Sequence, residues 1–415
     1  MQLIIFSITL FFIVLTQDVK AQVRKMTNGS QPNSSNRDSV EVKMTEYVRP
    51  DWKAIDMDFL SSYYSQDGNN GAVTGGIGTE QLTDFTQKVS IRVPMTPTFS
   101  LNVDGGYDYY SSASTDNIDN IRSSDSASDM RTHANIGASF DLSDTKMVGF
   151  RFGGSTEYDY TSISGGVNAA LFSRDQNTSL QLNLQAFIDK WDVIFPVELR
   201  RTARVATDRR NSYNASIGFS QIVSKRTQVQ IQIEGTYMNG LLSTPFHRVY
   251  FQEQNRAQIE LLPDTRTKIP IGFRLNSHLT ENLILRSYYR YYWDSWGMQG
   301  HTAQIELPIK LNRFLSIAPY YRYHTQTAVD YFRPYKEHTL DEQFYTSDFD
   351  LSALQSHAYG VAVSYSPAGG LIKAKIPFSN RPAFTIKSID VKYSHYDRST
   401  GLKADIISLG VGISF

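Results

Sequence analysis

The sequence lacks cysteine, net charge and, after residue 21, any apolar run long enough to cross a membrane as a helix. Without cysteine the chain has neither disulfide bonds nor the acylated cysteine of a lipoprotein. The 41 basic and 41 acidic residues of its 415 cancel, so nothing in the bulk charge attracts nucleic acid, and we expect no nucleic-acid partner. If the protein resides in a membrane, strands must place it there.

The first residues have the form of an export signal. An apolar stretch from Leu3 to Leu15 is followed by polar residues and the small residue Ala21. We therefore expect a signal peptide over residues 1–21, although the basic residues that usually precede the apolar stretch are absent; a single N-terminal anchor helix is the alternative. Residues 22–53 are rich in Ser, Asn, Thr and Arg and predict a flexible polar tail or a small plug.

Residues 54–415 repeat one pattern of alternating apolar and polar residues. Between Thr227 and Tyr237, for example, Val229, Ile231 and Ile233 alternate with glutamines. Such alternation predicts a β-strand, because successive side chains point to opposite faces. It does not by itself show which face meets water. Six further segments share the pattern: 98–110, 133–142, 146–158, 179–189, 282–294 and 405–415.

The connections between these segments are sorted by length. Short turns lie at 95–98, 142–145, 174–177, 224–227, 280–282 and 311–314, and longer polar loops alternate with them at 65–79, 111–129, 193–209, 241–264 and 327–355. One connection on the short-turn side is long, at residues 367–383. Aromatic clusters recur near the loop ends, as in residues 107–110 and 288–296. Short periplasmic turns, long external loops and an aromatic girdle are typical of outer-membrane barrels. We predict an all-β transmembrane antiparallel up-and-down barrel of about 16 strands over residues 54–415, with the apolar face toward lipid; a soluble multi-sheet protein is the alternative.

Four motifs resemble a known family. They are "YYSQDG" from Tyr63, "GGIGTE" from Gly75, "DYYSSASTDNID" from Asp108 and "YTSDFDLS" from Tyr345. With these motifs the chain resembles the Bacteroidota outer-membrane proteins grouped as domain of unknown function family number 3570, over roughly residues 55–415. The resemblance implies a bacterial outer-membrane barrel, but it implies no activity and no catalytic or ligand residues.

The polar faces of the strands provide charged candidates for the lumen. Two interpretations are open: a water-filled pore whose later, Arg-rich strands face acids from the earlier ones, or a polar core in which these side chains pair and fill the barrel. The candidates are Asp104, Asp108, Arg151, Glu157, Glu234, Arg274, Arg286, Arg290, Glu306 and Arg322, with Asp189 and Lys310 in addition.

The loop at 327–355 combines aromatic and charged residues. It predicts an ordered external cap; a constriction in the barrel mouth and a platform for a sugar or a protein partner are the alternatives. The residues concerned are Tyr331, Phe332, Arg333, Tyr335, Tyr345, Asp348 and Asp350.

Cofactors and catalysis have little support in the sequence. Oxygen ligands near Asp67 and Asp119 provide only a weak possibility of loop-bound calcium, because Asx-Gly clusters are usually plain turns. The eight histidines show no metal-binding spacing, so no metal site is predicted. A hydrolytic site would combine Ser347, Asp348 and His357, but turn capping explains the first two more simply, and no enzyme is expected.

These patterns predict a porin-like protein of a Gram-negative outer membrane that passes or binds small polar solutes. Its expected surroundings are outer-membrane lipid and other envelope proteins. The alternatives are an occluded barrel that anchors or assembles such proteins and, third, a hydrolase at the barrel mouth.

Overall fold

The computed structural model describes residues 54–112, 128–200, 206–374 and 384–415. The predicted signal peptide (1–21), the predicted tail or plug (22–53) and the possible calcium ligands at 116–120 lie outside these residues. Within the described ranges, no helix is both long enough and apolar enough to span a membrane.

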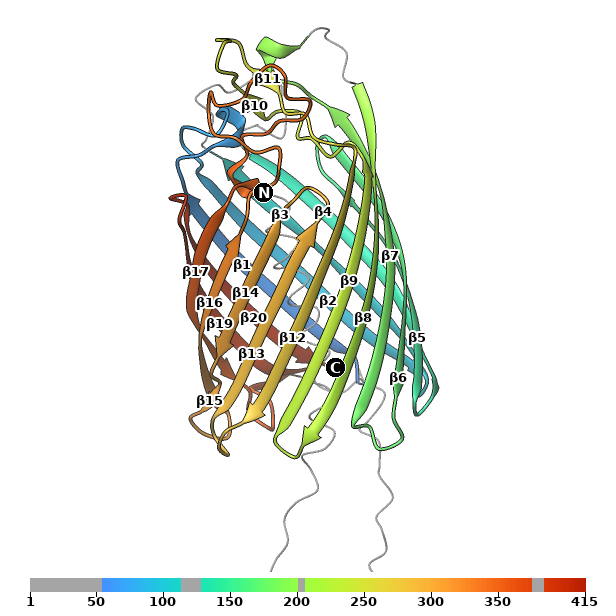
Figure 1. Ribbon diagram of the computed structural model, residues 1–415. Coiled ribbons are helices and arrows are strands. Elements are labelled where there is room, and N and C mark those ends of the chain that lie inside the picture. The colour runs from blue at the N-terminus through green and yellow to red at the C-terminus, as the bar shows by residue number, and fades with distance from the viewer. Residues whose placement is uncertain (1–53, 113–127, 201–205, 375–383) are drawn as a thin grey trace, which may run out of the picture. The chain divides into compact units, whose positions relative to one another are not determined.

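Sixteen long antiparallel strands form the wall of a closed barrel (Figure 1). They are β1 (Asp56–Asp67), β2 (Leu82–Thr96), β3 (Phe99–Ser112), β4 (Ser128–Ser143), β5 (Lys146–Thr156), β6 (Tyr160–Phe172), β7 (Thr178–Val193), β8 (Ala206–Ser224), β9 (Thr227–Gly240), β12 (Thr265–His278), β13 (Ile284–Asp294), β14 (Gln299–Glu306), β16 (Leu315–Gln326), β17 (Leu354–Tyr365), β19 (Phe384–Arg398) and β20 (Lys403–Ser414).

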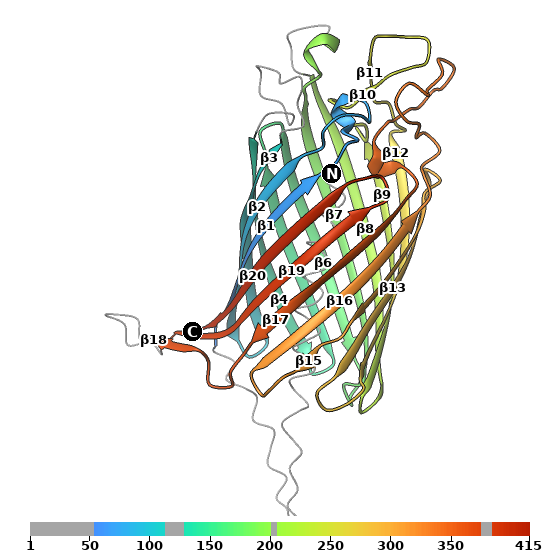
Figure 2. The ribbon, with the colours of Figure 1, turned by 90° about the vertical axis from the view of Figure 1, so that its left-hand side faces the viewer.

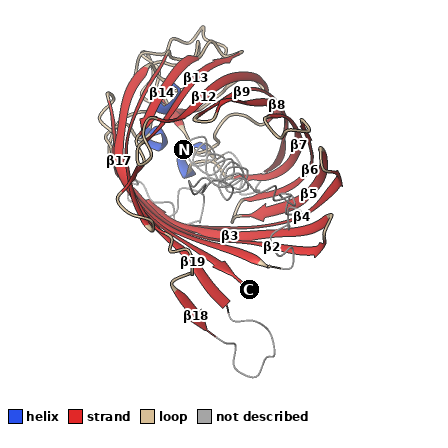
Figure 3. Cartoon of the chain, turned by 90° about the horizontal axis from the view of Figure 1, so that it is seen from below, coloured by secondary structure: helices blue, strands red, loops and turns tan. Residues whose placement is uncertain are grey.

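Closure joins the first strand to the last. β1 pairs with β2 on one side and with β20 on the other, in a register that runs from Asp56 opposite Ser414 to Asp67 opposite Lys403. Every other long strand pairs with its neighbours in the chain, so the ring has no free edge (Figure 3). The predicted fold class and strand number are confirmed.

The alternation in the strands places apolar side chains outside and polar ones inside. In β9, Ile231, Ile233 and Tyr237 are 45%, 51% and 45% exposed on the outer surface. The glutamines between them point inward, where Gln232 donates to Glu234 (2.7 Å). In water such an outer surface would be unfavourable by about 25 cal/mol per Å² of apolar area, whereas hydrocarbon solvates it. The outward apolar belt is therefore the feature expected of a membrane barrel.

The two ends of the barrel differ (Figures 1 and 2). Short turns join the strands at one end, the turn rim. The opposite end, the loop rim, carries the longer connections together with β10 (Arg248–Val249), β11 (Gln258–Ile259) and the short 3-10 turns η1 (Ala72–Thr74), η2 (Val197–Leu199) and η3 (Phe349–Leu351). At the turn rim, β15 (Ile309–Lys310) continues the wall, and β18 (Ile372–Ala374) pairs with the start of β19 outside the ring of strands. This β18–β19 pair accounts for the long connection on the short-turn side.

Candidate functional site

The ten predicted lumen residues all lie on the inward faces of the barrel wall. Nine of them have an exposed apolar neighbour along the chain, as Ile233 is beside Glu234 and Tyr321 is beside Arg322, and Arg286 shares the strand face of Arg290. The same alternation places Asp104, Asp108, Arg151, Glu157, Arg274, Arg286, Arg290 and Glu306 inside the ring. Asp189 also points inward and is 3% exposed, whereas Lys310 lies at the exposed turn rim.

The early strands carry inward acids held by neutral donors. Asn135 on β4 donates to Asp104 (2.8 Å), and Thr86 on β2 donates to Asp108 (2.9 Å). Arg151 on β5 has no ion-pair partner in the part of the chain that the structure describes. Asp189 on β7, in contrast, forms an ion pair with Arg210 on β8 at 3.0 Å, so the charges of this side are only partly paired.

The later strands carry an excess of inward cations. Arg286 on β13 pairs with Glu306 on β14 at 2.8 Å, and Arg290 approaches Glu234 on β9 at 4.0 Å. Two further cations lie over tyrosine rings: Arg274 over Tyr288 at 5.6 Å and Lys392 over Tyr320 at 4.5 Å. We call the inward cations Lys268, Arg274, Arg286, Arg290, Arg322 and Lys392 the basic wall.

Two cations of the basic wall form no ion pair within the described ranges. Neither Arg322 nor Lys268 makes a hydrogen bond or an ion pair with any residue that the structure describes. Arg322 is partly exposed to the lumen, and Lys268 is 9% exposed. A polar core that fills a barrel must pair its charges, because a buried unpaired charge is costly. Unpaired cations on an inward face instead require water or anions beside them.

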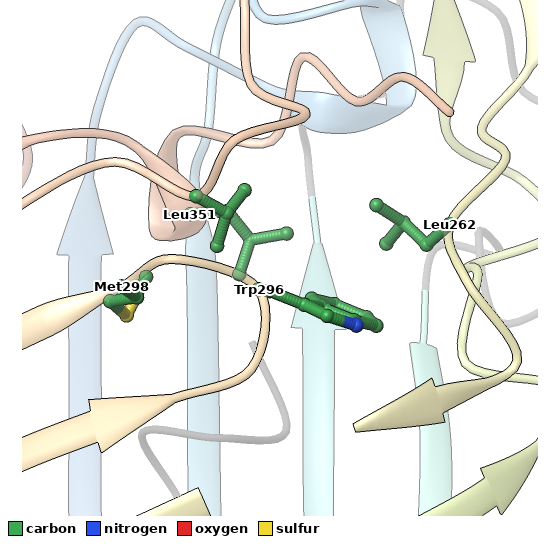
Figure 4. Packing of buried hydrophobic residues seen from close by; sticks show 5 residues of the cluster. Leu262, Trp296, Met298 and Leu351 are labelled. Atoms are coloured by element: carbon green, nitrogen blue, oxygen red, sulfur yellow. The ribbon is translucent and has the colours of Figure 1, made fainter. Parts of the chain in front are cut away.

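The loop rim carries a folded structure, the loop cap, which comprises residues 68–81, 241–264, 295–298, 327–353 and 399–402. An apolar cluster forms its centre and draws on several loops: Leu262, Trp296, Met298, Val329 and Leu351, each 3–6% exposed (Figure 4). Backbone bonds join the two longest loops, since the Leu261 and Tyr345 amides donate to each other's carbonyls at 3.1 and 2.7 Å.

The seven predicted mouth-loop residues all belong to the loop cap. Tyr331 packs against the central cluster and meets Trp296 edge-on at 6.2 Å. Phe332 lies against Phe349 at 5.2 Å, and Tyr335 against Tyr250 at 4.9 Å. The aromatic residues of this loop therefore pack within the cap.

The polar mouth-loop residues also make internal contacts. Tyr345 donates its hydroxyl to Gln258 (3.1 Å), and Arg333 forms an ion pair with Glu342 (2.7 Å). Their role is to hold the loop together, which is the behaviour expected of an ordered cap.

Asp348 and Asp350, from the motif "YTSDFDLS", anchor the loop to the barrel wall. Asp348 caps η3 by accepting the Asp350 amide (2.9 Å). Asp350 accepts from Arg398 at the end of β19 (2.6 Å), and the other terminal nitrogen of Arg398 lies 4.0 Å from Glu80. Burial, followed by the charge of Asp350, raises the pKa of Glu80 to about 7.

A second polar cluster lies beside this anchor. His247 Nδ1 is 3.4 Å from Glu260 Oε1 and 4.0 Å from Asp348 Oδ2. Thr346 donates its hydroxyl to Glu260 Oε1 (2.5 Å), and the Thr244 amide donates to Oε2 (2.7 Å). Burial would raise the pKa of Glu260, but the charge of His247 and these hydrogen bonds hold it below its usual range.

The sequence does not predict this cluster, because only the spacing of histidines along the chain was used to assess metal sites. His247 and Glu260 are 13 residues apart, and Glu260 meets Thr346 across 86 residues. No local spacing rule finds ligands from separate loops; the only signal in the sequence was the unusual density of polar residues in "YTSDFDLS".

The residues of the hydrolase hypothesis are engaged elsewhere. Ser347 is 2% exposed and donates its hydroxyl to the Arg333 carbonyl (2.9 Å). His357 lies on the outward face of β17, where Nδ1 pairs with the Tyr321 hydroxyl at 2.7 Å. Ser347 and His357 therefore do not form the nucleophile–base pair that the hypothesis requires.

The described part of the possible calcium site lies where the cap crosses the β1–β20 seam. Asn70 donates to the Thr400 carbonyl (2.6 Å), and Gln81 donates to Asp67 (3.3 Å). The Asn70 bond joins two loops and the Asp67 bond lies within the β1–β2 connection, and calcium binding there stays a prediction.

Comparison with solved structures finds other barrels at low similarity. OccK1 (OpdK) of Pseudomonas aeruginosa has 8% identity and a TM-score of 0.40, with 87% of this chain and 98% of that chain covered. The siderophore receptor PirA of the same organism has 10% identity and a TM-score of 0.39, with 86% and 80% covered. A bacterial polysaccharide outer membrane secretin has 9% identity and a TM-score of 0.44, with 86% and 98% covered. The barrel fold of this chain rests instead on its own strand pairing.

No curated protein matches the chain. A family model, in contrast, matches residues 96–375, which is more than half of the sequence and includes both loops that form the His247 cluster. The chain therefore belongs to the family described as Protein of unknown function (DUF3570).

Proposed function

We propose that the protein is an integral outer-membrane barrel whose lumen passes or binds small polar solutes, with a preference for anions. The basic wall carries the proposal, and in particular Arg322 and Lys268, which form no ion pair among the described residues. Cations of this kind attract anions into a narrow polar space and repel cations from it. The outward apolar belt supports a membrane location, and the role proposed is transport or binding rather than catalysis. The Bacteroidota attribution and the export signal stay predictions.

The second candidate is an occluded barrel that anchors or assembles other envelope proteins. The loop cap favours it, because its apolar centre and paired loops form a folded layer over one end of the barrel. In this case the cap would be the surface presented to partners.

Conductance in planar bilayers distinguishes the two candidates. The full-length protein, purified in detergent, is expected to form channels, and the reversal potential in a KCl gradient is expected to show anion preference. Arg322→Glu reverses one charge in the basic wall and should shift the reversal potential toward cation preference. Arg226→Glu is the matched control, since Arg226 lies in an exposed turn between β8 and β9.

Two results would contradict the pore. The first is a steady absence of conductance from protein whose circular dichroism shows an intact barrel. The second is conductance whose ion preference does not respond to Arg322→Glu. Co-purification of a stoichiometric envelope protein together with the first result would favour the occluded barrel.

A further inference from the structure

His247, Glu260 and Asp348 bring three metal-binding side chains together from the two longest loops. One nitrogen and two carboxylate oxygens, one atom from each residue, all lie within 4.8 Å of one another. We propose that this cluster is a binding site for a divalent transition metal ion, with Zn²⁺ as the best match, that fastens loop 241–264 to loop 327–353.

The spacing of the three atoms suits a metal ion with little movement. The nitrogen lies 3.4 Å from one oxygen and 4.0 Å from the other. For a triangle with these two sides and a third between an oxygen–oxygen contact and 4.8 Å, the point equidistant from its corners is at most about 2.4 Å from each. Zn–N and Zn–O bonds are about 2.0–2.2 Å long, so a contraction of a few tenths of an ångström completes three bonds.

Charge is the second observation, and it is independent of the spacing. The interior of the cap brings four carboxylates close together: Arg398 contacts Glu80 and Asp350, and His247 contacts Glu260 and Asp348. Glu80 Oε2 is buried without a hydrogen-bond partner. A bound dication would place positive charge directly among these carboxylates, which favours their burial together.

Asp348 has one oxygen available for a metal. Its Oδ1 accepts the Asp350 amide, whereas Oδ2 receives no hydrogen bond within the described part of the chain and faces His247 at 4.0 Å.

The donor set indicates the type of ion. Imidazole suits zinc and other transition metals, whereas calcium prefers six to eight oxygen ligands. Three protein ligands leave a fourth tetrahedral position. The side chains of His247 and Asp348 are 12% and 17% exposed, so water can reach that position.

Two hydrogen bonds hold the Glu260 carboxylate in its position. Thr346 donates to one of its oxygens and the Thr244 amide to the other, which orients the carboxylate toward His247. Thr346 and Asp348 belong to the same short motif, so the loop that contributes one ligand also positions another.

Zinc content and zinc affinity test the proposal. The full-length protein in detergent is stripped with EDTA, dialysed against ZnCl₂ and analysed by mass spectrometry of the metal, and its affinity is measured by competition with a chromophoric chelator. We expect one bound zinc per chain. His247→Gln, Glu260→Gln and Asp348→Asn should each weaken binding by about 100-fold or more, since loss of even a supporting contact costs about 10- to 100-fold.

Asp341→Asn is the matched control, because Asp341 is an exposed acid in the same loop, outside the cluster. It should bind zinc as the wild type does. Circular dichroism establishes that each variant retains the barrel, and Asp348→Asn stands in if Glu260→Gln does not fold. Absence of bound zinc from the folded wild-type protein would overturn the proposal, and so would zinc binding that all three ligand substitutions leave unchanged.

Limited proteolysis of loop 241–264 gives a readout besides metal content. Zinc should slow cleavage of the wild-type protein and not of Asp348→Asn. A cleavage rate that changes with pH but is the same in zinc as in EDTA would indicate that an ion pair, and no metal, joins the loops. This result would also overturn the proposal.

Discussion

Asp294, at the loop-rim end of β13, is a single side chain on which five hydrogen bonds converge. It is 0% exposed. Its Oδ1 accepts the amides of Trp296 and Met298 at 3.0 and 3.1 Å, and its Oδ2 accepts the Tyr292 hydroxyl at 2.7 Å. Arg266 on β12 donates to Oδ2 through two nitrogens, and its guanidinium lies 4.1 Å from the centre of the Trp296 ring.

We predict that Asp294→Ala lowers the free energy of unfolding by about 4 kcal/mol. Breaking a buried ion pair by removing one partner costs roughly 3–5 kcal/mol, because the other charge stays buried. The Arg266 side chain is 5% exposed and would be left in that state. Each buried amide that loses its acceptor adds about 1–3 kcal/mol, but such terms overlap and do not sum.

Denaturation by guanidinium chloride in detergent, followed by tryptophan fluorescence, measures the change. Asp330→Ala is the control: this exposed acid lies in the same cap and should change the free energy by no more than about 0.5 kcal/mol. The double substitution Arg266→Met with Asp294→Leu should cost less than Asp294→Ala alone, since no charge is left unpaired. A loss of less than about 1 kcal/mol for Asp294→Ala would refute the reasoning.

Three further predictions concern the loop cap. Gly297 has φ +88°, a backbone conformation that is strained for residues with a Cβ, and a Cβ there would overlap the Asp330 carboxylate. Gly297→Ala should therefore lower the free energy of unfolding by about 1–2 kcal/mol in the same titration. An unchanged free energy would contradict this backbone strain. Burial raises the pKa of Glu80 from 4.5 to about 7, so its contribution to stability is complete below about pH 4.5 and is lost as the pH rises through 7. Denaturation midpoints should therefore fall between pH 5 and pH 8, and Glu80→Gln should make that fall smaller; an identical fall in the variant would count against the shift. Phe251 is 2% exposed and packs on Tyr345 at 4.9 Å, so Phe251→Ala should lower the local free energy of unfolding by about 3–5 kcal/mol. Proteolysis of loop 241–264 should become faster while the circular dichroism of the barrel is unchanged. Resistance to proteolysis equal to that of the wild type would argue against this packing.

The barrel could be predicted from the sequence because its signal is repeated and local. Each strand alternates with period two, and a slip of one residue would turn its apolar face inward. The orientation of Val229, Ile231 and Ile233 follows once sixteen such strands and their sorted connections are considered together. The inward position of residues such as Arg322 follows from the same alternation.

The partners of those inward residues could not be predicted. Whether Arg290 meets Glu234 depends on the register of three strands and on Gly272, which lies between them and has no side chain. The centre of the cap depends on tertiary packing in the same way. Trp296 and Leu351 come from different loops, and no periodicity marks them as neighbours.

The loop cap also bears on how the ring is completed. Arg398 ends β19, Asp350 lies in the loop before β17, and Glu80 precedes β2, so their contacts span the first and last hairpins of the chain. Asn70 reaches Thr400 across the same seam, through 330 residues of sequence. These contacts become available only when β1 and β20 have paired, which is among the slowest kinds of contact for a chain to form. An ordered cap therefore requires that the final strand has paired. In a chain that stops folding before closure, these loops would stay unfolded and accessible to proteases.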